Sequence, residues 1–220
     1  AAATVKGSAS GTNTVDTSAA TKAVTYTGGS GADVIGTATA NNAQANTFNL
    51  GGGDNRIADT NAMSGNNTVT LASDKTAATN SATGANAFTF GAGNNTVTDT
   101  GSKGMYVNAT TGNNTITGGS GADFITVTDG NNTISTGDGV DTVFVGMGAN
   151  TVTLGGGADK FTLSAVNTSS AVFTTLTDIG SGDTITLPST AFANSTGKLG
   201  AKLTSGVDDY QTFLNGGASM

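Results

Sequence analysis

The sequence contains no cysteine, histidine or tryptophan, and only one proline among its 220 residues. Without cysteine no disulfide can stabilise the fold, and without cysteine or histidine the common nucleophile and base pairs of enzymes are missing. Glutamate is absent too, so all 15 acidic residues are aspartates, which favour turns over helix interiors. We therefore expect a protein that is not an enzyme and that is poor in helix.

Long hydrophobic runs and basic clusters are also missing. No apolar stretch approaches the ~20 residues of a membrane span, so we expect no insertion into a membrane. The net charge is -7, and the eight lysine and arginine residues are scattered along the chain. Because no basic stripe could neutralise phosphates, we expect no nucleic acid partner.

The chain instead has 34 glycines and a repeat of nine residues. The repeat is unbroken from position 111 to 163, where its key position alternates between asparagine and aspartate. The key residues are Asn114, Asp123, Asn132, Asp141, Asn150 and Asp159. Two positions after each of them comes an apolar residue, in order Ile116, Ile125, Ile134, Val143, Val152 and Phe161. If two repeats form one coil of a β-solenoid, all the aspartates lie on one edge and all the asparagines on the other.

The apolar positions extend this register upstream, with some longer steps. A second apolar residue often follows two positions after the first, as in Val143 and Val145, which predicts short strands with one buried side. The longer steps predict loop insertions near 36–45, 58–64 and 72–84. Because the period ends at Leu163, we expect a solenoid over 1–163 and a C-terminal cap, itself incomplete, over 164–220.

Two segments carry a complete glycine-rich motif, GGxGxDxUx, in which U is a large apolar residue. They are residues 28–36 and 118–126, and shorter variants surround Asp141 and Asp159. These motifs resemble the RTX (repeats-in-toxin) family, whose repeats form a calcium-loaded parallel β-roll. The resemblance implies an all-β fold, a right-handed parallel β-roll or β-solenoid of nonapeptide repeats, with Ca²⁺ as the bound ion.

The chemistry of the aspartate edge favours the same ion. Successive coils lie ~4.8 Å apart, and at an effective dielectric of ~20 neighbouring carboxylates repel by roughly 3 to 4 kcal/mol. A divalent cation with oxygen ligands removes this repulsion. We expect one site between Asp123 and Asp141 and another between Asp141 and Asp159. Backbone carbonyls of the glycine loops would complete the sites, from Gly119, Gly121, Gly137, Gly139, Gly155 and Gly157.

The opposite edge departs from the RTX pattern, because asparagine occupies the key position there. We expect this edge to continue upstream through Asn13, Asn46, Asn55, Asn67, Asn86 and Asn95. Two explanations remain open: a stacked amide ladder that closes the turns without metal, or weaker calcium sites that use amide oxygens. Asp33 is a further candidate ligand, with a complete motif but no aspartate one coil away on its own edge.

Two C-terminal segments extend the resemblance. Residues 178–187, DIGSGDTITL, look like the segment that closes RTX rolls, which adds Asp178 and Asp183 as candidate metal ligands. Residues 210–214, YQTFL, are similar to the short helix after the roll in type I secreted bacterial surface-layer (S-layer) proteins. This resemblance implies type I secretion to an extracellular bacterial surface and self-assembly into an S-layer or filament. Cell-surface polysaccharide is a further candidate partner.

Threonines occupy the outward positions beside the asparagine edge. They form the pairs Thr96/Thr98, Thr115/Thr117, Thr133/Ser135 and Thr151/Thr153, with one serine. Exposed strands favour β-branched threonine, which also forms cross-strand ladders. A ligand-binding face, as in ice-binding or adhesin β-solenoids, is the alternative. For the chain as a whole, the tail of a secreted RTX enzyme is another.

Overall fold

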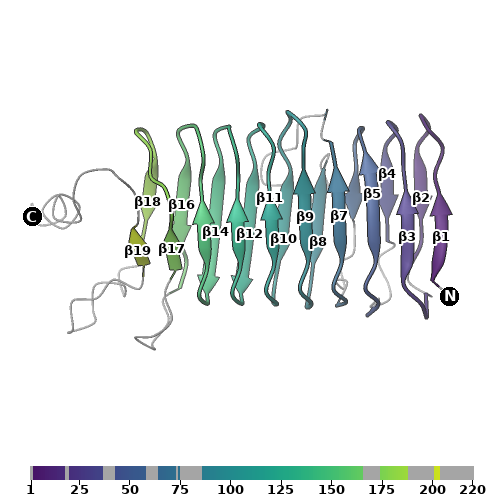
Figure 1. Cartoon of the computed structure of the whole chain (residues 1–220), viewed down its shortest axis with the longest axis horizontal. Coiled ribbons are helices and arrows are strands. Elements are labelled where there is room, and N and C mark those ends of the chain that lie inside the picture. The colour runs from purple at the N-terminus through teal and green to yellow at the C-terminus, as the bar shows by residue number, and fades with distance from the viewer. Residues whose placement is uncertain are drawn as a thin grey trace, which may run out of the picture.

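The computed structural model describes residues 2–17, 20–36, 43–57, 64–72, 74, 86–165 and 174–187, and the backbone of 201–203. The regular elements within these ranges are all β-strands, wound as a parallel β-solenoid of about eight turns. Odd-numbered strands form one layer and even-numbered strands the other, from β1 at one end to β18 and β19 at the other (Figure 1). The all-β parallel fold predicted from the repeat is confirmed.

The ten odd-numbered strands form one parallel sheet, which we call sheet A. In spatial order they are β1 (Ala3–Lys6), β3 (Val24–Thr27), β5 (Thr47–Gly51), β7 (Thr68–Leu71), β9 (Thr96–Asp99), β11 (Thr115–Thr117), β13 (Thr133–Ser135), β15 (Thr151–Thr153), β17 (Thr174–Leu176) and β19 (Ala201–Leu203).

The nine even-numbered strands form the second parallel sheet, sheet B. In the same direction they are β2 (Asn13–Val15), β4 (Asp33–Ile35), β6 (Arg56–Ile57), β8 (Ala87–Phe90), β10 (Tyr106–Ala109), β12 (Phe124–Asp129), β14 (Thr142–Met147), β16 (Lys160–Leu163) and β18 (Thr184–Thr186).

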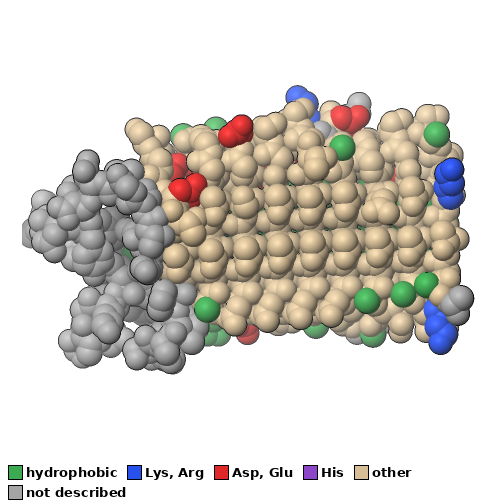
Figure 2. All heavy atoms as spheres, in the orientation of Figure 1, with side chains coloured by type: hydrophobic (Ala, Val, Ile, Leu, Met, Phe, Trp, Pro, Cys, Tyr) green, Lys and Arg blue, Asp and Glu red, His purple; other side chains and the backbone are tan. Residues whose placement is uncertain are grey.

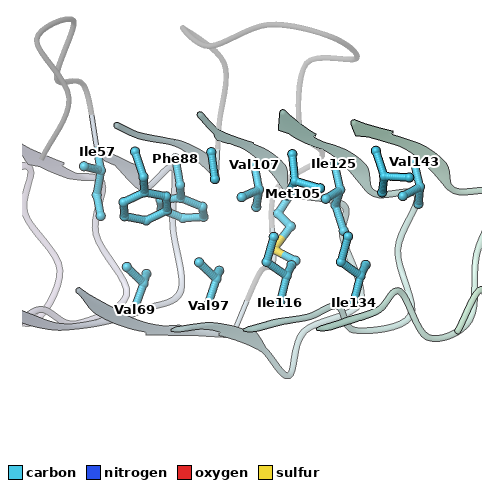
Figure 3. Close-up of a cluster of buried hydrophobic side chains, with 14 of the residues drawn as sticks. Ile57, Val69, Phe88, Val97, Met105, Val107, Ile116, Ile125, Ile134 and Val143 are labelled. Carbon is cyan, nitrogen blue, oxygen red and sulfur yellow. The ribbon is translucent and has the colours of Figure 1, made fainter. Parts of the chain in front are cut away.

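The core is the narrow space between the two sheets. Alternate residues of a strand point to opposite faces, and here the apolar residues of each strand are those that face inward. Figure 3 shows Ile57, Phe88, Val107, Ile125 and Val143 of sheet B facing Val69, Val97, Ile116 and Ile134 of sheet A. Each of these side chains is at most 1% exposed, which confirms the apolar positions predicted as the core.

Coil length varies along the axis. In the regular part Asn114 bonds to Asn132, and Asn132 to Asn150, each pair 18 residues apart. Upstream, the equivalent partners Asn46 and Asn67 are 21 residues apart, and Asn67 and Asn95 are 28 apart. The extra residues fall largely in ranges 37–42, 58–63 and 75–85, so most of the predicted insertions lie outside the described residues.

Strand pairing continues past position 163, where the nine-residue period ends. β17 pairs with β15, β18 with β16, and β19 with β17, all in parallel. The described part of the predicted cap region therefore extends both sheets, and the segment 210–214 expected to form a helix lies outside the described residues. Within the described ranges there is no helix long and apolar enough to cross a membrane.

Candidate metal centre

The aspartates of the repeat form one column along the turns that lead into sheet B. Asp123, Asp141 and Asp159 precede β12, β14 and β16, and strand register places them on neighbouring coils. In each aspartate Oδ1 accepts a hydrogen bond from the backbone N–H of the preceding coil. Asp123 N–H donates to Asp141 Oδ1 at 2.7 Å and Asp141 N–H donates to Asp159 Oδ1 at 2.8 Å. The predicted stacking of these three carboxylates is confirmed.

The second oxygen of each carboxylate has no hydrogen-bond partner. Oδ2 of Asp123, Asp141 and Asp159 is buried, and these side chains are at most 2% exposed. A buried carboxylate oxygen without a hydrogen-bond donor costs folding free energy. A cation bound to Oδ2 of each of these aspartates would offset that cost. Oxygen atoms also converge beside Gly118, where an added Cβ would collide with Asp123 Oδ2 and with the carbonyl oxygen of Thr136. Buried oxygens of this kind fit Ca²⁺.

The glycine loops approach one another so closely that side chains would not fit. Gly137 and Gly139 have φ values of 96° and 140°, in the region that favours glycine. An added Cβ would meet the carbonyl of Gly119 at Gly137 and the carbonyl of Gly121 at Gly139. Carbonyls of successive loops therefore line the edge, as the predicted ligand set requires.

Two of the predicted carbonyl ligands already accept a hydrogen bond between coils. Asp138 N–H donates to Gly119 O at 3.2 Å, and Gly156 N–H donates to Gly137 O at 2.9 Å. A carbonyl oxygen has two lone pairs, so these bonds leave one acceptor position on each. The roles of Gly155 and Gly157 as ligands stay predictions, although both follow the same left-handed loop path, with φ of 83° and 151°.

Burial raises the pKa of the three carboxyl groups. It raises the pKa of Asp123 to about 8 and that of Asp141 to about 6, and it raises the pKa of Asp159. Backbone N–H donors oppose the rise, whereas the neighbouring aspartates of the column add to it. Without a cation Asp123 is therefore largely protonated at neutral pH, because its buried carboxyl is poorly solvated.

No three acidic side chains of the described residues surround a common point. A cation on this edge would have at most two carboxylates as ligands and would take its remaining oxygens from the backbone. The sites expected between Asp123 and Asp141 and between Asp141 and Asp159 have this composition, and they stay predictions. Thr136, which the sequence did not single out, is buried beside this edge, where it lowers the pKa of the Asp141 carboxyl and its hydroxyl donates to the carbonyl of Leu154.

At the column position itself, the upstream part of the same edge is uncharged except for Asp33. Strand register places Asn13, Asp33, Asn55, Asn86 and Met105 in line with Asp123. The expectation that Asn13, Asn55 and Asn86 belong to the asparagine edge is therefore wrong. Their residue type suggested the wrong edge, because the long upstream coils break the alternation of types that holds downstream.

Asp33 lies in this column without an aspartate on either side. Its Oδ1 accepts hydrogen bonds from the Tyr26 hydroxyl at 2.8 Å and from Asn13 Nδ2 at 2.6 Å, and its Oδ2 is buried without a partner. Burial and the Asp33 carboxylate raise the pKa of the Tyr26 hydroxyl. Because two side chains already bind this carboxylate, its environment differs from that of Asp123.

The two C-terminal candidates take different positions. Asp183 continues the column, since Asp159 N–H donates to its Oδ1 at 2.9 Å and Gly180 N–H to its Oδ2 at 2.7 Å. Asp178 instead accepts from the N–H groups of Leu154 and Gly155, at 2.7 and 2.8 Å. Both oxygens of each carboxylate therefore have backbone donors, unlike those of Asp123, Asp141 and Asp159.

The opposite edge is an amide ladder. In each member except the last, Asn150, Nδ2 donates to Oδ1 of the asparagine on the next coil, and the backbone N–H donates to the same oxygen. The Nδ2 to Oδ1 distances lie between 2.8 and 3.1 Å. The ladder runs through Asn46, Asn67, Asn95, Asn114, Asn132 and Asn150. Each shared Oδ1 is occupied by two donors, so the geometry supports the metal-free explanation.

A second, exposed ladder runs beside the first. Asn94 N–H donates to Asn66 Oδ1, and the pattern repeats through Asn113 and Asn131 at 2.7 to 2.8 Å. It ends where Ala149 N–H donates to Asn131 Oδ1. The sequence signal was the tripeptide Asn-Asn-Thr, which begins at positions 66, 94, 113 and 131.

Comparison with known families identifies the same segment. Residues 106–134 and 126–161 match the sequence profile of the RTX calcium-binding nonapeptide repeat, which holds four copies of that repeat. The match supports the RTX family for this part of the chain, and RTX nonapeptide repeats bind calcium. It includes Asp123, Asp141 and Asp159, whose buried oxygens fit that ion. No curated protein and no solved structure gave a match.

Proposed function

We propose that the chain is an extracellular structural protein whose solenoid is completed by Ca²⁺ bound between Asp123, Asp141 and Asp159. The observation that carries the proposal is the row of buried Oδ2 atoms without a hydrogen-bond donor. The calcium-binding repeat matched over residues 106–161 supports the identity of the ion. The ligands would be these carboxylates together with carbonyls of the glycine loops at 119–121, 137–139 and 155–157.

Calcium here has a structural task. With no cation, the downstream coils at 111–163 combine buried carboxylates with 12 glycines among 53 residues, and the ordering of glycine is entropically costly. Weak sites of the extracellular kind, with Kd on the order of 10⁻⁴ to 10⁻³ M, would stay empty in a cell and fill outside it. The downstream coils would then be unfolded when the chain leaves a bacterial cell, and they would fold at the surface.

Calcium titration of the chain, followed by circular dichroism, tests this function. We expect strand signal to rise with calcium in the millimolar range and to fall when chelator is added. A matched magnesium titration is the control, because Mg²⁺ demands a smaller and more regular shell. A strand signal that is identical in chelator and in millimolar calcium would overturn the proposal.

Assembly into a layer or filament is the second part of this function. Its support is the C-terminal likeness to surface-layer proteins and the elongated shape, which offers long flat sides for lateral contacts (Figure 1). Sedimentation and electron microscopy with and without calcium test this part independently. Ordered arrays that appear only with calcium would support it, and a calcium-loaded monomer at all concentrations would overturn it.

A further inference from the structure

Sheet A carries an outer column of nine threonines in register, one on each strand from β1 to β17. Strand pairing aligns Thr4, Thr25, Thr47, Thr68, Thr96, Thr115, Thr133, Thr151 and Thr175. A second column beside it contains Thr27, Asn49, Thr70, Thr98, Thr117, Ser135 and Thr153. The array is longer than the four pairs evident from the sequence.

Strand propensity does not account for this column, because sheet B provides an internal comparison. The equivalent outer column of sheet B contains Thr14, Val34, Arg56, Ala87, Tyr106, Phe124, Thr142, Lys160 and Thr184. Both columns lie on parallel strands of the same solenoid, and the preference of strands for β-branched residues acts on both. Only sheet A repeats one side chain at every position, which indicates a requirement specific to that face.

The face is also uncharged. From Thr25 to Thr153 both outer columns of sheet A contain only threonine, serine and one asparagine. Figure 2 views this face and shows unbroken rows of side chains that are neither charged nor apolar, with lysine, arginine and aspartate near its margins. A ligand for this face would therefore be neutral.

Identical side chains at intervals of ~4.8 Å suit a ligand that itself repeats. A crystalline polysaccharide is one such ligand, but the two outer columns of sheet A contain no aromatic ring to stack on sugars. A second copy of the chain is another. Nine strands at ~4.8 Å and two columns about 7 Å apart give roughly 300 Å², less than half of the ~800 Å² per partner in stable complexes. A protein partner is therefore not favoured.

We infer that the threonine face of sheet A binds ice. Ice is neutral, rigid and periodic, and so it is complementary to a face that is uncharged and repeats one side chain. β-Branching restricts χ1, so the column holds its hydroxyl and methyl groups in a fixed pattern before any ligand arrives. Water beside each methyl has restricted orientations, and each hydroxyl can anchor one water to the protein. The inference requires the folded solenoid but not assembly into a layer.

Thermal hysteresis and inhibition of ice recrystallisation, measured on the full calcium-loaded chain, test the inference. We expect both activities in the wild type and their loss in the double variant Thr133→Tyr/Thr151→Tyr, which breaks the column. The matched control is Thr142→Tyr/Thr184→Tyr on the outer column of sheet B, which should retain both activities. Circular dichroism of each variant during calcium titration reports folding separately, and so reports the calcium-dependent function independently.

Three outcomes would overturn the inference. The first is a wild type that folds with calcium but shows neither activity. The second is equal loss in the two double variants, which would mean that the threonine face is not the site. The third is a wild-type dimer that Thr133→Tyr/Thr151→Tyr dissociates while ice activity is absent, which would make the face a contact between copies.

Discussion

Aspartate and asparagine differ by one atom of the side chain, and in this solenoid that difference separates two kinds of edge. An asparagine offers both a donor and an acceptor, so Asn132 can bond to Asn150 above and accept from Asn114 below. An aspartate offers acceptors only, so Asp141 accepts from the N–H of Asp123 and its Oδ2 is left over. The carboxylate edge therefore leaves a buried acceptor for a cation on each coil, whereas the amide edge is complete.

Exchanging the two residue types should have opposite effects. Asp141→Asn keeps an acceptor for Asp123 N–H but removes a charged ligand from both central sites, and we expect calcium affinity to fall more than about tenfold. Asn132→Asp should leave calcium affinity nearly unchanged but destabilise the calcium-loaded fold by about 3 kcal/mol, because a buried carboxylate oxygen would face Asn150 Oδ1.

Isothermal titration with calcium and urea unfolding in saturating calcium measure the two quantities separately. Equal losses of calcium affinity in Asp141→Asn and Asn132→Asp would contradict the distinction between the edges. A stable Asn132→Asp variant with additional calcium sites would show that the amide edge can also bind the ion.

At the scale of the strand, each coil contributes only a few side chains to a core one residue deep from each sheet. Val152 is fully buried between the sheets, whereas Val140, at 57% exposure, lies on a turn of the aspartate edge. In so narrow a core, a buried polar group finds neither water nor a hydrogen-bond partner. A single polar substitution at an inward position should therefore lower the stability of the fold.

The substitution of valine by threonine tests this, because the two side chains have nearly the same shape. We expect Val152→Thr to lower the free energy of unfolding by about 2 kcal/mol, since its hydroxyl would be buried among apolar neighbours. Val140→Thr is the matched control, and its effect should lie within about 0.5 kcal/mol. Urea unfolding in saturating calcium measures both, and similar effects at the two positions would contradict the assigned core.

The strands could be predicted from the sequence to the extent that the period is regular. Ile125, Val143 and Phe161 were identified as core because a spacing of nine residues alternates the chain between two sheets. The same reasoning misplaced Asn55 and Asn86, because coil length upstream varies and residue type is then a poor guide to the edge. It also could not place Asp183, since 24 residues separate it from Asp159.

At the scale of the whole molecule, the carboxylate edge links stability to pH. In the metal-free fold the pKa of Asp123 is about 8 and that of Asp141 about 6, both above the value of 3.8 for an unperturbed aspartate. The folded state then binds more protons than the unfolded state between about pH 4 and 8. Stability without calcium should therefore fall as pH rises through this range.

Thermal unfolding in chelator at pH 5 and at pH 8 tests the direction of this linkage. We expect the higher midpoint at pH 5. In saturating calcium the difference should shrink or reverse, because the ion binds the deprotonated carboxylates and its affinity rises with pH. A midpoint in chelator that increases from pH 5 to pH 8 would contradict the burial of these groups.

The molecule also divides into two zones along its axis. The turns before β6, β8 and β10 carry Asn55, Asn86 and Met105 at the column position, whereas those before β12, β14 and β16 carry aspartates. In a solenoid each coil contacts only its neighbours, so the two zones can differ in stability. The metal-free amide ladder supports both zones, but only the downstream zone contains stacked buried carboxylates.

Hydrogen exchange with and without chelator should resolve these zones. We expect removal of calcium to accelerate exchange in β12 to β18 and to leave β5 to β9 largely protected. In the Asp141→Asn variant, exchange in β12 to β18 should be partly accelerated even when calcium is present. Uniform loss of protection along the whole axis would indicate instead that the solenoid unfolds as one cooperative unit.

The direction of winding has a mechanical consequence. All the strands run across the long axis, with β1 at one end and β19 at the other, so the hydrogen bonds between coils point along that axis (Figure 1). A pulling force applied to the two ends would act on the hydrogen bonds of one coil junction at a time. The coils would therefore separate one after another, each at low force. Bound calcium would strengthen the junctions between the downstream coils. The molecule would therefore extend first from its N-terminal end, near β1.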